Sequence, residues 1–110
     1  MNTPKKKIKV VCTGMDLSNA RIFNIVKIGV YDKTVDGCLK ALKDGIFDKF
    51  KREAPRFSVD EFKESRTFVE DGKEITECRF ILKEYDDEDS ELFTKLAGQV
   101  VFTEILPKPE

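Results

Sequence analysis

Three cysteines are the residues of this sequence best suited to nucleophilic, redox or metal chemistry, and they stand far apart, at Cys12, Cys38 and Cys78. No Cys-x-x-Cys pair occurs, so neither a dithiol redox motif nor a zinc-binding spacing is present. The chain has no histidine, which excludes a Cys-His or Ser-His-Asp arrangement and any imidazole metal ligand. Because each cysteine falls in an apolar pattern, we expect three buried thiols and predict a protein that is not an enzyme.

An acidic run resembles the start of a calcium loop, since Asp87, Asp89 and Glu91 alternate. The glycine that such a loop needs at its sixth position is Leu92, and its twelfth position is Gly98 instead of glutamate. We therefore interpret the run as a solvated connector that caps a short helix ending near Leu96, with Gly98 just after it. The six glycines form no phosphate-binding loop either. No metal and no cofactor are predicted.

The charges are unevenly distributed along a chain whose 20 basic and 21 acidic residues nearly cancel. The first half, residues 1–55, is basic, and residues 56–110 are acidic. Four lysines stand near the start: Lys5, Lys6, Lys7 and Lys9. We interpret residues 1–6 as a flexible basic tail that is solvated and does not contact nucleic acid. The reason is that a chain with almost no net charge has no overall field to attract nucleic acid. Contact of these four lysines with nucleic acid is the alternative.

A hairpin can be predicted to the residue around Asp71 and Gly72, which form the two-residue signal of a type I′ turn. This turn brings charged, apolar and threonine partners together in one register. The predicted pairs are Glu70 with Lys73, Phe68 with Ile75, Thr67 with Thr76, Arg66 with Glu77, and Glu64 with Arg79. A capping-box spacing at Ser58 leaves open a single helical turn before the first strand of the hairpin.

The same register divides the hairpin into two faces. Small and apolar residues suited to packing under a helix form one of them: Ser65, Thr67, Val69, Thr76, Cys78, Phe80 and Leu82. The other face alternates large apolar groups with charges, as binding surfaces do, and its candidate site is Phe62, Arg66, Phe68, Ile75, Arg79 and Ile81. Its charges cancel, Glu64, Glu70 and Glu77 against Arg66, Lys73 and Arg79, which favours a protein partner over a phosphate backbone. The alternative is that a loop or the acidic helix covers Phe62 and Phe68.

Other segments supply the elements that would position these residues. Alternation predicts a strand over residues 8–13, and β-branched and aromatic residues predict another over 22–31. An apolar stripe through Val35, Cys38, Leu42, Ile46 and Phe50 predicts a long helix. Its expected N-cap is Thr34, and its expected end is at 54–55, with a break near Gly45 left open. A closing strand is predicted over 100–106.

This order of two strands, a long helix, two strands, a short helix and a strand resembles that of the ubiquitin-like β-grasp. The fold class predicted is α+β, with a mixed or antiparallel sheet of about five strands, one helix on one face, and residues 7–110 as a single domain. A ferredoxin-like sheet is the alternative if residues 18–28 are helical. The resemblance lies in element order only, and the chain does not end in the Gly-Gly of a conjugated modifier.

Together these features predict a small, non-enzymatic protein-binding module, such as an adaptor, inhibitor or accessory subunit, that uses an exposed sheet face. The partner is another protein, and association with a second copy is left open. Widely spaced, reduced thiols and the absence of a secretory signal or a long apolar run favour the cytoplasm and no membrane contact. The alternative is a nucleic-acid-binding module that uses the basic N-terminal segment and sheet aromatics.

Overall fold

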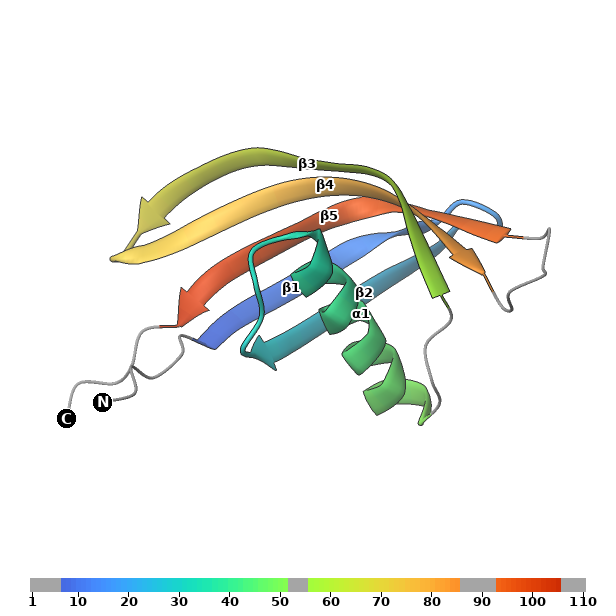
Figure 1. Cartoon of the computed structure of the whole chain (residues 1–110), viewed down its shortest axis with the longest axis horizontal. Helices are drawn as coiled ribbons and strands as arrows, with labels where there is room; N and C mark the ends of the chain where they lie inside the picture. Colours follow the sequence, from blue (N-terminus) through green and yellow to red (C-terminus); the bar gives the residue numbers. More distant parts are fainter. Residues whose placement is uncertain (1–6, 52–55, 86–92, 106–110) are drawn as a thin grey trace.

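The structure is a computed structural model that describes residues 7–51, 56–85 and 93–105. It is an α+β fold in which one helix lies on one face of a long antiparallel sheet (Figure 1). The elements are β1 (Lys7–Asp16), β2 (Arg21–Gly29), α1 (Val35–Phe50), β3 (Arg56–Glu70), β4 (Lys73–Tyr85) and β5 (Phe93–Ile105).

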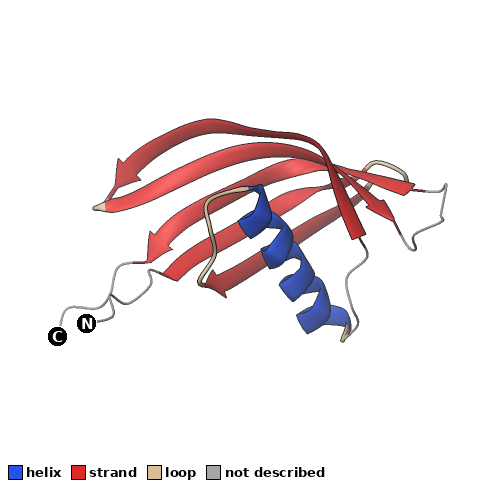
Figure 2. Cartoon of the chain, in the orientation of Figure 1, coloured by secondary structure: helices blue, strands red, loops and turns tan. Residues whose placement is uncertain are grey.

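The five strands form a single sheet in the order β2-β1-β5-β4-β3, so that β2 and β3 are its edges. All neighbouring pairs are antiparallel, which makes the sheet antiparallel rather than mixed. Residues 21–29 are a strand and not a helix, and this removes the condition on which the ferredoxin-like alternative depended. Hairpins join β1 to β2 and β3 to β4, and α1 lies between the two hairpins in sequence (Figure 2).

Helix α1 begins at its predicted cap, where the Thr34 side chain accepts a hydrogen bond from the Gly37 backbone N–H. It ends at Phe50 and is closed by Lys51 in the left-handed conformation, before the predicted end at 54–55, which lies outside the described residues. The break near Gly45 that the sequence left open does not occur, since α1 is continuous over Val35–Phe50. The glycine instead lets the helix approach the side chain of Ile25. A Cβ added there would lie 2.4 Å from the Ile25 Cγ2 atom.

The core lies between α1 and the face of the sheet that bears the even-numbered residues of β1, β4 and β5. Its largest fully buried side chains are those of phenylalanine, leucine and valine, and the three cysteines are fully buried as well. Helix α1 packs mainly on β1 and β2. Of the hairpin face predicted to pack under the helix, the β4 residues are buried as expected: Thr76, Cys78, Phe80 and Leu82. Its β3 residues Ser65, Thr67 and Val69 are exposed, because α1 lies over the other half of the sheet.

The hairpin turn and four of its five predicted pairs are confirmed. Asp71 and Gly72 both have positive φ, 53° and 75°, as a type I′ turn requires. The fifth pair is wrong, because Glu64 lies opposite Cys78 and Lys63 lies opposite Arg79. A register shift between Glu64 and Arg66 causes this difference. A β-bulge inserts one residue into one strand only and thereby exchanges the faces of the residues beyond it.

Two predicted helical segments are not helical where the structure describes them. No helical turn precedes the hairpin at Ser58, because β3 is extended from Arg56 onward. Leu96 and Gly98 belong to strand β5, so the predicted helix does not reach Leu96, and its first part, 86–92, lies outside the described residues. Pairing of β5 with both β1 and β4 overrides the local acidic signal.

The open face of the sheet as candidate functional site

One face of the sheet, which we call the open face, is not covered by any described element. It consists of the odd-numbered residues of β1, β4 and β5 together with the residues opposite them in β2 and β3. Directly opposed residues of neighbouring strands share a face, so the register assigns each side chain. Helix α1 lies on the other side, and one helix is about 10 Å across.

The open face has an aliphatic centre. Val26, Val11 and Val101 stand in register across β2, β1 and β5. A second row of apolar residues crosses the same three strands and reaches β4. Its register pairs are Ile22–Met15, Met15–Ala97 and Ala97–Ile81. Ile22, Val26 and Ile28 are 79%, 49% and 58% exposed. Sequence reasoning missed these three residues of β2, although the strand carries apolar residues on both faces, which is the signal that could have revealed them.

Basic residues dominate the charge of this face. The described basic residues on it are Lys7, Lys9, Arg56, Lys63, Arg66, Lys73, Arg79, Lys83 and Lys95, and the described acidic ones are Asp60, Glu61, Glu70 and Glu77. The predicted cancellation of charge is therefore wrong. The bulge moves Glu64 to the helix side and places Lys63 on the open face. Such a surface favours a partner with acidic groups.

Arg66 is held in place by two neighbours on the open face. Its Nε and Nη2 atoms donate to the two carboxylate oxygens of Glu77, at 3.0 Å each. Its guanidinium lies 4.4 Å from the centre of the Phe68 ring. The bidentate bond lowers the pKa of Glu77 and raises the pKa of Arg66. Since the guanidinium stacks on Phe68, a nucleobase would have to displace it before stacking on that ring.

The structure brings five of the six predicted hairpin site residues together on the open face. These are Arg66, Phe68, Ile75, Arg79 and Ile81. Phe62 lies opposite Phe80 on the helix side and packs against the core. Of the four N-terminal lysines, Lys7 and Lys9 lie on the open face of β1, whereas Lys5 and Lys6 lie outside the described residues.

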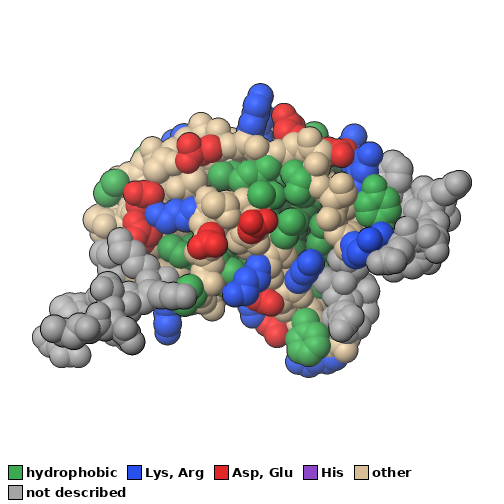
Figure 3. All heavy atoms as spheres, in the orientation of Figure 1, with side chains coloured by type: hydrophobic (Ala, Val, Ile, Leu, Met, Phe, Trp, Pro, Cys, Tyr) green, Lys and Arg blue, Asp and Glu red, His purple; other side chains and the backbone are tan. Residues whose placement is uncertain are grey.

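The opposite side of the molecule holds a hydrophobic hollow of about 270 Å³. Phe23, Leu42, Ile46, Phe57 and Leu96 contribute to its lining, between the C-terminal half of α1 and the ends of the strands. Figure 3 shows hydrophobic side chains gathered beside α1 on this side.

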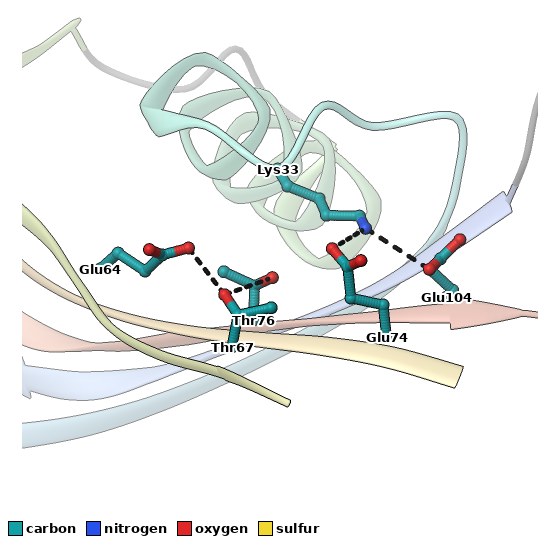
Figure 4. Close-up of polar contacts among 6 residues, drawn as sticks. All are labelled: Lys33, Glu64, Thr67, Glu74, Thr76 and Glu104. Atoms are coloured by element: carbon teal, nitrogen blue, oxygen red, sulfur yellow. Dashed lines mark hydrogen bonds and ion pairs between the residues drawn. The ribbon is translucent and has the colours of Figure 1, made fainter. Parts of the chain in front are cut away.

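Polar contacts on the helix side fix the loop between β2 and α1 to the sheet. The Lys33 Nζ atom lies 2.8 Å from a Glu74 oxygen and 3.6 Å from one of Glu104 (Figure 4). In the same view, the Thr67 hydroxyl donates to Glu64 at 2.7 Å and lies 3.3 Å from the Thr76 hydroxyl. These contacts connect the loop, β3, β4 and β5 with one another. We interpret them as contributions to the stability of the fold and not as a catalytic site.

The three cysteines converge in the core. The sulfur atoms of Cys12 and Cys38 are 3.9 Å apart, and Cys78 is also buried. The contact with Cys12, together with burial, raises the pKa of Cys38, and burial raises the pKa of Cys78. Neutral thiols in such surroundings are poor nucleophiles. Within the described residues, no group of three acidic, cysteine or histidine side chains is placed to hold a metal ion.

Comparison with protein-family models, curated proteins and solved structures finds no match for this chain. The β-grasp-like arrangement therefore stays a prediction. Among the described elements, the one helix falls short of the length and hydrophobicity needed to cross a bilayer.

Proposed function

We propose that this protein is a cytoplasmic, non-enzymatic binding module whose open face docks an acidic surface of another protein. The observation that carries the proposal is the combination of an aliphatic centre with an excess of basic residues on a face that α1 leaves uncovered. Apolar centres surrounded by charge are typical of protein interfaces, and complementary charge sets both association rate and specificity.

Nucleic acid is the second candidate, favoured by the same basic excess. Sheets that bind single strands stack bases on exposed aromatic rings. Here Phe68 is stacked by Arg66, and the centre of the face is formed by Val11, Val26 and Val101. Aliphatic side chains offer no stacking surface, and Tyr85 of this face stands at the end of β4, so the centre of the face favours a protein.

A photo-crosslinking amino acid at Val101, in the chain expressed in its native host, tests the proposal. We expect a defined crosslinked protein from Val101 and none from the same probe at Lys43, an exposed position of α1. With the purified partner, Arg79→Glu should weaken binding about tenfold or more, and the matched Lys43→Glu should leave it nearly unchanged.

Two results would overturn the proposal. One is equal crosslinking from both positions, which would show that the open face is not selected. The other is saturable binding of a labelled single-stranded oligonucleotide that weakens steeply with salt and is abolished by Arg79→Glu. That result would assign the face to nucleic acid instead.

A further inference from the structure

The two edges of the sheet differ in their capacity to pair with another strand. Edge strand β3 carries two register shifts, between Val59 and Glu61 and between Glu64 and Arg66, and many of its side chains are charged. Bulges and charges are devices by which proteins keep an edge from pairing. Edge strand β2 has no such shift along Arg21–Gly29, contains no proline, and carries only two charged residues, Arg21 and Lys27.

A hollow of about 300 Å³ runs along the edge that β2 forms. Asn24 and Val26, which point to the open face, line it together with Ile25 and Lys27, which point to the helix side. Since residues of both faces reach the hollow, it lies along the free edge of β2. Its other wall is α1, at Gly45, Asp48 and Lys49.

The position of α1 disfavours a second copy as the occupant. Gly45 lies against Ile25 near the middle of β2, and the C-terminal turns of the helix extend past this edge in Figure 1. Two β2 strands paired about a two-fold axis at their middles would bring the two helices to the same place. A single extended segment beside β2 meets only one helix, which would cover it.

The charges of the hollow indicate what the segment carries on its helix-facing side. Asp48 is paired with Lys27, which lowers the pKa of Asp48 and neutralises its charge. Lys49 leaves the lining with a net positive charge. An acidic side chain is the complement there. On the open face, Ile22, Val26 and Ile28 are the complement of apolar side chains.

We propose that the free edge of β2 binds an extended segment of a partner protein that adds a sixth strand to the sheet, with apolar and acidic residues in alternation. Main-chain hydrogen bonds to β2 hold the segment, its apolar side chains extend the aliphatic centre of the open face, and its acidic side chains face Lys49. This is β-strand addition to an open sheet edge. It is independent of whether the rest of the open face docks a protein.

The probe that tests the site is a short blocked peptide alternating valine and glutamate, titrated into the full chain and followed by the backbone amide signals of the protein. We expect saturable shifts at residues 21–29, with slower hydrogen exchange of the β2 amides. A peptide with proline at its central valine should not bind, since proline lacks a donor. A valine–lysine peptide should bind about tenfold more weakly.

Lys49→Glu should weaken binding of the valine–glutamate peptide about tenfold, while the matched Lys43→Glu, outside the hollow, should change it little. Shifts confined to β3, equal binding of the proline peptide, or no saturation would overturn the proposal. So would a dimer in sedimentation whose β2 amides are already protected, because a second copy would then be the occupant. Lys49 lies off the open face, so these outcomes are distinguishable from failure of the docking proposal tested at Arg79.

Discussion

Phe62 and Phe68 lie on opposite faces of the sheet although they are six positions apart in one strand. In a regular strand this even spacing would place both rings on the same face. The bulge between Glu64 and Arg66 adds one residue and reverses the alternation. Phe62 therefore packs against the core beside Phe80, and Phe68 lies under the Arg66 guanidinium on the open face.

This relationship predicts different costs for truncation of the two rings. Phe62→Ala should lower the free energy of unfolding by about 2–3 kcal/mol, because a ring packed against the core leaves a void. Phe68→Ala should lower it by about 1 kcal/mol or less, mostly the lost contact with Arg66. Urea unfolding of both variants measures this. Equal losses would contradict the assignment of the two rings to different faces.

Gly14 and Gly98 face each other across β1 and β5, beneath the rings of Phe23 and Phe80. A Cβ at Gly98 would lie 2.2 Å from the Thr13 carbonyl oxygen and 2.8 Å from the Gly14 Cα atom. Because both are backbone atoms, Gly98→Ala should destabilise the chain by about 1–3 kcal/mol.

Gly29→Ala is the matched control for Gly98→Ala, because a Cβ there would meet only the Tyr31 side chain, at 3.2 Å. We expect its thermal midpoint to stay closer to that of the parent chain. Equal stability of the Gly98→Ala and Gly29→Ala variants would contradict this prediction. It would show that β1 and β5 can move apart near Gly98 without a loss of unfolding free energy.

Tyr31 makes stability depend on pH in the alkaline range. Burial, and then the hydrogen bond that its hydroxyl donates to Asp44 at 2.9 Å, raise the pKa of Tyr31 to about 12 from its ordinary 10. The folded state thus keeps a proton that the unfolded state loses first. The stabilisation is fully present below pH 10 and is lost as the pH rises to about 12.

Comparison of the parent chain with Tyr31→Phe isolates this effect, because the other titrating groups are shared. The difference in unfolding free energy should favour the parent by about 1 kcal/mol at pH 7, from the lost hydrogen bond, and should shrink between pH 10 and 12. Tyr85→Phe should retain the alkaline loss. A difference that stays constant with pH would contradict the assigned proton.

The three thiols should be inert in the folded protein. All three are buried in the core, burial helps to raise the pKa of Cys38 and raises that of Cys78, and only accessible thiolates react with aromatic disulfide reagents. We expect native labelling at pH 8 to be at least about a hundredfold slower than in denaturant, where all three react, because labelling then requires opening of the core. Rapid labelling of a single thiol in the native state would show an accessible cysteine and contradict the packing described.

The sequence by itself determined those elements whose signals are local. The type I′ turn follows from Asp71 and Gly72, since a few residues suffice to fix positive φ. The start of α1 follows from the Thr34 cap and the apolar stripe. The pairs nearest the turn, from Glu70–Lys73 to Arg66–Glu77, follow from counting outward, because no irregularity intervenes before Ser65.

Only the tertiary structure decided how these elements meet. A bulge in β3 places Phe62 and Phe68 on different faces and moves Lys63 to the open face. It leaves no signature in the composition of β3, because it is a feature of the pairing of β3 with β4. The segment around Leu96 is a strand because β1 and β4 provide partners on both sides, which a local acidic helix signal cannot outweigh. The free edge of β2 and the uncovered face exist because α1 packs on one side only, and such contacts between distant residues cannot be found by reading along the chain.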